Sequence, residues 1–165
     1  MKIDKLWNGL KRIANGDYVL EGDLISEETI EIDLNDRFVV RGRIQTKKSI
    51  VVRCGIEAGC GIEAGEGIKA GEGIKAGCGI EAGCGIEAGE GIKAGWGIKA
   101  GWGIEAGEGI KAEKFIDVQK RIFAGISVYR TSRDCDKTIR CAELRNGEIC
   151  YGDLTLTKEG KPDEG

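Results

Sequence analysis

The sequence predicts an all-β fold: a single-stranded parallel β-helix, or β-solenoid, whose successive coils stack by β-pairing. Two observations predict it. The hexapeptide Gly-Ile-(Glu/Lys)-Ala-Gly-Xaa recurs ten times between Gly55 and Ala112. The composition is also that of a regular repeat, with 28 glycines, one proline and three each of Phe, Trp and Tyr among 165 residues. Neither an ordinary globular domain nor a disordered chain has this balance.

Each hexapeptide is expected to form one short strand and one corner. In an extended chain, residues two apart share a face, so Ile and Ala point inward while the Glu or Lys between them points outward. The flanking glycines tolerate the left-handed or otherwise restricted dihedral angles of tight corners. Ile and Ala are therefore the predicted core pair of every repeat.

The outward charges predict how many hexapeptides close one coil. Outward side chains on neighbouring strands lie about 5 Å apart, where opposite charges stabilise and like charges destabilise. Two hexapeptides per coil give two columns that alternate in sign except where Lys99 adjoins Lys111. One contains Glu57, Lys69, Glu81, Lys93 and Glu105, and the other contains Glu63, Lys75, Glu87 and Lys99. Three hexapeptides per coil would instead place like charges side by side, so we predict a twelve-residue coil with this charge ladder setting its register.

The same period extends the solenoid beyond the regular repeats. Steps of two hexapeptides from Ile56 reach Leu20 upstream and Val128 downstream, always at apolar residues. We therefore predict a solenoid over residues 20–130, most regular over 55–112. About nine coils at about 4.7 Å each would form a rod roughly 40 Å long.

Both ends of the rod are expected to carry caps, because an open solenoid end exposes unpaired strand edges. Leu6, Leu10 and Ile13 recur at helical spacing, which predicts an N-terminal helical cap within residues 1–19. Alternation around Asn146-Gly147 predicts a C-terminal β-hairpin cap over residues 131–157. Residues 158–165 form a polar tail.

The repeat resembles known hexapeptide proteins, but without their catalytic residues. It is superficially similar to the left-handed β-helix of hexapeptide acyltransferases and gamma-class carbonic anhydrases, families that use three hexapeptides per coil and essential histidines. This chain contains no histidine. A closer resemblance is to uncharacterised bacterial and prophage proteins with Gly-Ile-(Glu/Lys)-Ala-Gly-(Trp/Glu) arrays, which implies a fold but no activity. We therefore expect no enzyme, no catalytic residue and no cofactor.

The cysteines are interpreted as structural rather than metal-binding. In the predicted register, Cys54 and Cys78 would lie two coils, about 9–10 Å, apart, too far for a disulfide or a shared zinc. Cys60 and Cys84 would be separated in the same way, so all four are expected to be reduced fillers of the corners. The sequence leaves the state of Cys135, Cys141 and Cys150 open.

Two tryptophans are the candidate interaction residues. Trp96 and Trp102 occupy corner positions, where an aromatic side chain either binds a partner or a sugar, or covers neighbouring glycines. The favoured function is a non-catalytic structural, assembly or protein-interaction rod that binds a protein partner or a second copy. The alternative is a surface or carbohydrate-binding module of phage or cell-surface type.

Charge and hydropathy restrict the partners and the compartment. A formal net charge of -3 disfavours binding to nucleic acid or to an anionic membrane. The N-terminal residues lack the apolar run of a signal peptide, and no stretch is long enough to span a bilayer. We expect a cytoplasmic protein, while a virion or another export route stays open.

Overall fold

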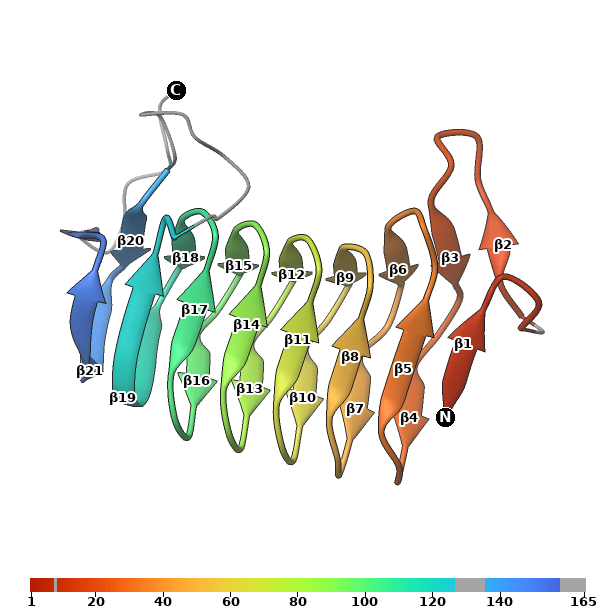
Figure 1. Ribbon diagram of the computed structural model, residues 1–165, viewed down its shortest axis with the longest axis horizontal. Helices are drawn as coiled ribbons and strands as arrows, with labels where there is room; N and C mark the ends of the chain where they lie inside the picture. The colour runs from red at the N-terminus through yellow and green to blue at the C-terminus, as the bar shows by residue number, and fades with distance from the viewer. Residues whose placement is uncertain (8, 127–135, 158–165) are drawn as a thin grey trace.

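The computed structural model describes residues 1–7, 9–126 and 136–157 and shows a parallel β-solenoid of about seven turns (Figure 1). The described residues contain strands, turns and bends but no helix. The all-β solenoid is therefore confirmed. At about 4.7 Å per turn the rod is roughly 30 Å long, which is shorter than predicted.

Three strands make one coil, so the rod has three faces. The chain passes from face 3 to face 1 and then to face 2 before it returns to face 3. In the regular repeat it comes back to the same face after three hexapeptides: Ile62 pairs with Ile80, and Ile80 pairs with Ile98. All pairs between the repeat strands are parallel and in register, as the stacked arrows of Figure 1 show.

Faces 1 and 2 belong to one sheet, because a long strand continues from one face to the other at the C-terminal end. Face 1 is formed by β4 (Leu24–Ser26), β7 (Ile44–Thr46), β10 (Ile62–Ala64), β13 (Ile80–Ala82), β16 (Ile98–Ala100) and the first part of β19 (Phe115–Ala124). Face 2 is formed by β1 (Lys2–Asp4), β5 (Ile30–Asp33), β8 (Ile50–Val52), β11 (Ile68–Ala70), β14 (Ile86–Ala88), β17 (Ile104–Ala106) and the second part of β19.

Face 3 is a separate sheet. Its parallel strands are β3 (Tyr18–Leu20), β6 (Phe38–Val40), β9 (Ile56–Ala58), β12 (Ile74–Ala76), β15 (Ile92–Ala94), β18 (Ile110–Ala112), β20 (Thr138–Cys141) and β22 (Asp153–Leu156). The short strand β2 (Lys11–Arg12) pairs antiparallel with β3.

The prediction of two hexapeptides per coil is wrong. The described pairs within the regular repeat join strands three hexapeptides apart, and this register places Glu63 beside Glu81 and Lys75 beside Lys93. Exposed ion pairs contribute only a few tenths of a kcal/mol each, so they do not decide between coil sizes. Two strands per coil would require each short corner to reverse the chain, whereas three strands require each corner to turn it through only a third of a circle.

Glycine occupies the corners because the backbones of neighbouring coils approach closely there, and not because the chain adopts a left-handed conformation. No described glycine of the repeat has a positive φ, contrary to the expectation from sequence. Instead, a Cβ on the glycine that follows a repeat Ala would overlap a carbonyl oxygen one coil earlier, as Gly83 would overlap that of Gly65. The glycine before the Ile has more room in the central coils: a Cβ on Gly85 would lie 3.4 Å from the carbonyl oxygen of Gly103.

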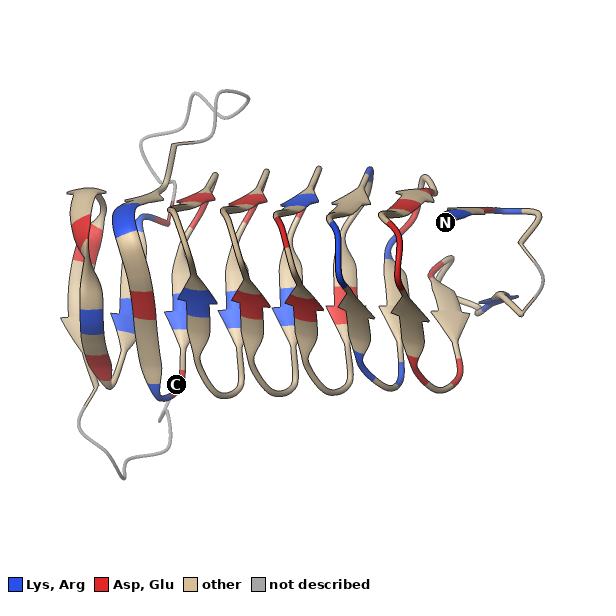
Figure 2. Ribbon diagram, turned by 90° about the horizontal axis from the view of Figure 1, so that it is seen from below, with Lys and Arg blue, Asp and Glu red and all other residues tan. Residues whose placement is uncertain are grey.

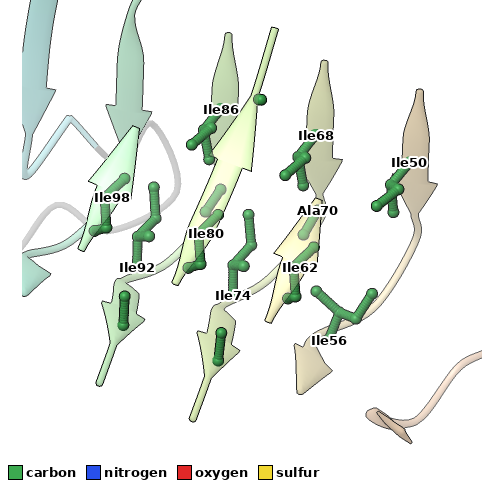
Figure 3. Packing of buried hydrophobic residues seen from close by; sticks show 14 of the residues in the cluster. Ile50, Ile56, Ile62, Ile68, Ala70, Ile74, Ile80, Ile86, Ile92 and Ile98 are labelled. Atoms are coloured by element: carbon green, nitrogen blue, oxygen red, sulfur yellow. The ribbon is translucent and has the colours of Figure 1, made fainter. Parts of the chain in front are cut away.

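The inward Ile and Ala side chains fill the rod. Every Ile and Ala of the ten repeats is at most 3% exposed, and Figure 3 shows isoleucines from all three faces converging on the axis. The predicted inward residues of the flanks, such as Phe38, Ile44 and Ile116, are also buried. They were predicted correctly because both coil sizes share the six-residue step. Val128 lies outside the described residues.

The coil that begins at β4 is larger than the coils of the regular repeat. Leu24 pairs with Ile44 and Ile30 with Ile50, which is a longer step than that between Ile62 and Ile80 in the regular repeat. The two extra residues lie between β5 and β6, where the chain turns into face 3. Leu34 in this corner is 2% exposed and joins the core, so the longer corner adds an apolar side chain without breaking the stack.

The predicted N-terminal helical cap is wrong. Strand β1 pairs with β5 in parallel, and β2 pairs with β3, so residues 1–19 cover the first coil with backbone pairs. Trp7 and Leu10 pack against the core, whereas Leu6 is 85% exposed. Unpaired strand edges need backbone partners, and strands supply these where an amphipathic helix would not.

The predicted C-terminal hairpin is also wrong. Strand β20 pairs with β22 in parallel, and β21 (Glu143–Tyr151) pairs in parallel with β19. The Asn146-Gly147 dipeptide lies within β21, where Gly147 has φ 120° at a register shift. The solenoid thus continues past residue 130. Residues 158–165 of the predicted tail lie outside the described part of the chain.

A charge reversal at Lys93 distinguishes the two coil sizes. With three hexapeptides per coil its strand neighbours are Lys75 and Lys111, so Lys93→Glu should raise the free energy of unfolding by roughly 0.2–1 kcal/mol. Two hexapeptides per coil would place Glu81 and Glu105 beside it, and the same change would then lower stability. Lys69→Glu is the control, because it should destabilise in either register; urea unfolding compares both variants with the native chain.

Two neighbouring glycines test the corner geometry. Gly83→Ala places a methyl group against the carbonyl of Gly65 and should destabilise by about 1–3 kcal/mol or more. Gly85→Ala, only two residues away, should cost clearly less. Thermal or urea unfolding compares the two variants, and equal losses would show that the close approach does not restrict the corner.

Candidate interaction faces and corners

With three hexapeptides per coil, outward side chains of the same charge become neighbours on face 3. The mid-strand residues of β9, β12, β15, β18 and β20 are, in spatial order, Glu57, Lys75, Lys93, Lys111 and Arg140. The last four, which we name the basic column, place like charges on neighbouring strands. In Figure 2 they contribute a run of blue bands on the strands behind the front row.

An acidic edge borders the basic column. Glu72, Glu90 and Glu108 occupy the same corner of successive coils, with Glu90 N donating to Glu72 O and Glu108 N donating to Glu90 O. Two of the carboxylates turn back over the preceding coil: Gly55 N donates to Glu72 Oε2 over 3.0 Å, and a Cβ on Gly73 would lie 3.8 Å from Glu90 Oε2. The Asp136 carboxylate lies beside Gly109. We name Glu72, Glu90, Glu108 and Asp136 the acidic edge.

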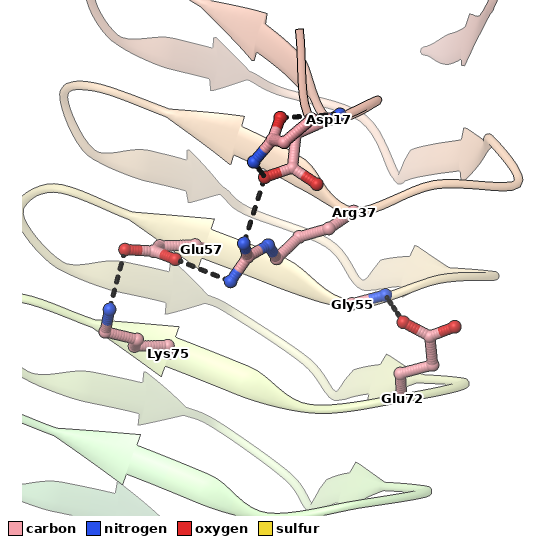
Figure 4. Close-up of polar contacts among 7 residues, drawn as sticks. Asp17, Arg37, Gly55, Glu57, Glu72 and Lys75 are labelled. Atoms are coloured by element: carbon pink, nitrogen blue, oxygen red, sulfur yellow. Dashed lines mark hydrogen bonds and ion pairs between the residues drawn. The ribbon is translucent and has the colours of Figure 1, made fainter. Parts of the chain in front are cut away.

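The two charge columns line one shallow groove. It has a volume of about 810 Å³, and residues of both columns border it along face 3. At its N-terminal end the charges are paired, because Arg37 contacts both Asp17 (2.9 Å) and Glu57 (3.3 Å) and Lys75 reaches Glu57 (2.8 Å), as Figure 4 shows. Farther along the rod the two signs run as parallel stripes.

The residues of the charge ladder predicted from sequence lie on all three faces of the rod. Its ion pairs in the structure are Lys69 with Glu87 (2.7 Å), Lys75 with Glu57 (2.8 Å) and Lys99 with Glu81 (2.9 Å), each between neighbouring coils. The hydrogen bonds that Lys69 and Lys99 donate to their partner carboxylates raise the pKa of both lysines. Like charges meet where Glu63 adjoins Glu81, Glu87 adjoins Glu105, and Lys93 adjoins Lys75.

Both tryptophans lie on exposed corners of consecutive hexapeptides. Trp96 is 57% exposed and Trp102 is 62% exposed. The lysine one coil further lies over each ring, with Lys114 Nζ 5.9 Å from the Trp96 ring centre and Lys120 Nζ 4.2 Å from that of Trp102. Each indole is thus partly covered by a cation–π contact while much of its surface stays open to solvent.

Trp102 also borders a groove on face 2. This groove has a volume of about 670 Å³, and Val51 and Phe123 add apolar surface to it. Glu87 and Glu105 stand on neighbouring strands within the same groove. An aromatic wall beside carboxylates is a chemistry that can bind a polyhydroxylated ligand.

The four repeat cysteines lie at corners, but their neighbours differ from those that the predicted register gave them. Cys60 and Cys78 are adjacent in one corner column, because Cys78 N donates to Cys60 O. Both thiols, like Cys84 and Cys150, are exposed, whereas Cys54 and Cys141 are buried. Among residues 1–7, 9–126 and 136–157, no three His, Cys, Asp or Glu side chains are grouped to hold a metal. Cys135 lies outside these ranges.

Comparison with known proteins found no match to a family model, to a curated protein or to a solved structure. In the part of the chain that the structure describes, no helix is long and apolar enough to cross a membrane.

Thiol labelling tests the two classes of corner cysteine. Burial raises the pKa of Cys54 to about 11, so its thiol stays protonated and protected at mildly alkaline pH. Iodoacetamide under native conditions should therefore modify Cys60, Cys78 and Cys84 much faster than Cys54, as peptide mass spectrometry measures. In urea, Cys54 should react like the others. Rapid native labelling of Cys54 would contradict its position in the core.

Proposed function

We propose that this protein is a non-catalytic assembly or protein-interaction rod that uses the charged stripes of face 3 to bind a protein partner or a second copy. The observation that carries the proposal is the basic column Lys75, Lys93, Lys111 and Arg140 beside the acidic edge. The remaining support comes from the filled core.

Folding alone does not require the basic column. Mid-strand outward positions tolerate either sign, since the same face has Glu57 beside Lys75 and face 1 has Glu81 beside Lys99. Like charges on neighbouring strands lower stability. A feature that costs stability and could be avoided by single substitutions is most simply explained by binding.

The interior of the described coils offers no room for a substrate. The Ile and Ala side chains fill the axis, so any ligand must bind to faces, corners or ends. The chain has no histidine to act as a general base, which supports a non-catalytic role.

A carbohydrate-binding or surface module is the second candidate. The exposed ring of Trp102 above the face 2 groove favours it, because aromatic surface next to Glu87 and Glu105 suits a sugar ring and its hydroxyl groups. Trp96, on the adjacent corner, borders a separate groove on face 1.

Two binding assays separate the candidates. The immobilised native rod should retain a protein from an extract of its source, and that protein, once identified and purified, should still bind the native rod. The double variant Lys93→Glu/Lys111→Glu should lose this binding at least tenfold. Lys69→Glu/Lys99→Glu, with the same change of net charge on other faces, is the matched control and should bind normally.

The second assay is a glycan array. The assembly proposal expects no sugar bound by the native rod. A specific glycan whose binding is lost in Trp102→Ala but kept in Lys93→Glu/Lys111→Glu would favour the carbohydrate candidate and overturn the first proposal.

A further inference from the structure

We propose that face 3 is a two-fold symmetric interface, through which two copies of this chain associate side by side with their rods parallel. The inference rests on the proposed function and names the partner of the same site as a second copy. It depends on the spacing and order of the two charge stripes.

The two stripes have the same repeat. One residue of the basic column and one of the acidic edge occur in each successive coil, so both stripes advance by the β-pairing distance of about 4.7 Å. A partner that matches several coils must carry separated stripes of both signs with this same rise. A second copy of the rod carries the same two stripes with the same rise, so it meets this requirement.

Symmetry restricts how the two copies meet. A two-fold axis perpendicular to the rods would place the basic column of one copy against that of the other, which is repulsive. An axis parallel to the rods and displaced toward the acidic edge places each basic column against the acidic edge of the other copy. This arrangement is isologous, so each ion pair occurs twice. It also keeps corresponding coils of the two copies at the same height along the rods. Lys93 of one copy therefore faces the region of Glu90 and Glu108 of the other.

The size of face 3 predicts a modest affinity. Its eight parallel strands at about 4.7 Å give a face roughly 30 Å long, the length of the rod. With a width of about 15–20 Å, its area lies at the lower limit of specific interfaces, about 500–700 Å² per partner. Glu90, Glu108 and Lys111 also interact within their own rod, so each intermolecular pair replaces part of an existing contact. We expect micromolar, salt-sensitive association.

Complementary charge reversal tests the interface. Lys93→Glu/Lys111→Glu makes both stripes acidic at the two central coils, and Glu90→Lys/Glu108→Lys makes both stripes basic at the same two coils. Sedimentation equilibrium at low salt should show a native dimer and two monomeric variants. An equimolar mixture of the variants should recover the dimer as a one-to-one complex, because each acidic stripe then faces a basic one. In about 1 M salt, where the Debye length is about 3 Å, native association should weaken at least tenfold.

The controls separate an interface from a folding effect. Circular dichroism must show native β-structure for each variant, and Lys93→Gln/Lys111→Gln, which removes charge without reversing it, should weaken the dimer less than the reversal does. The net-charge control Lys69→Glu/Lys99→Glu should dimerise normally. A native rod that stays monomeric at low salt and high concentration would overturn the dimer, as would face 3 variants that dimerise like the native chain.

The outcome also separates this inference from the function on which it rests. A monomeric native rod that still retains a purified protein through Lys93 and Lys111 would overturn the dimer and leave the interaction function intact. A monomeric rod that loses no partner on charge reversal would overturn both.

Discussion

The close stacking of one coil on the next is the constraint on which this structure depends. Where glycine follows a strand of the regular repeat, the carbonyl oxygen of the preceding coil occupies the space that a side chain would need, as Gly65 does for Gly83. Glycine at that corner lets the backbone pairs continue without interruption along all three faces. The stacking then brings inward Ile and Ala into continuous columns and determines which outward side chains are neighbours. Charge patterns on the surface are thus a consequence of the backbone register and not its cause.

The sequence predicted the interior of the rod better than its cross-section. A six-residue step identifies the inward residues whatever the number of strands per coil, which is why Phe38, Ile44 and Ile116 were correctly predicted to be buried. The coil size needed a second signal, and the charges were too weak to supply it. Opposite charges meet in both registers: Lys69 would adjoin Glu81 in the smaller coil and adjoins Glu87 in the larger one. The geometry of the corners decides between the two coil sizes. In a single sequence this geometry is visible only through the corner glycines, which are easily interpreted as residues of a left-handed turn.

The ends were mispredicted because local patterns were weighed without the strand edges that they must cover. Leu6, Leu10 and Ile13 fit a helix, yet the first coil presents backbone groups that β1 and β2 satisfy by pairing. Asn146-Gly147 fits a hairpin, yet a hairpin would leave β19 unpaired along its outer edge, and β21 covers that edge in parallel instead. Both errors have the same origin, because the demand for backbone partners comes from residues distant in the sequence.

The candidate site could not be predicted from the sequence because the predicted coil size was wrong. With two hexapeptides per coil, Lys75 and Lys93 would each lie between carboxylates and Lys111 would adjoin Lys99, so no basic column would form. With three hexapeptides per coil, the three lysines form one basic column next to the acidic edge. The coil register therefore turns a balanced composition into a surface with two separated stripes. A partner of a single sign would be attracted by one stripe and repelled by the other, since they border the same groove. A partner that presents both signs at the same rise gains from both, and that rise is the spacing between neighbouring strands of a β-sheet.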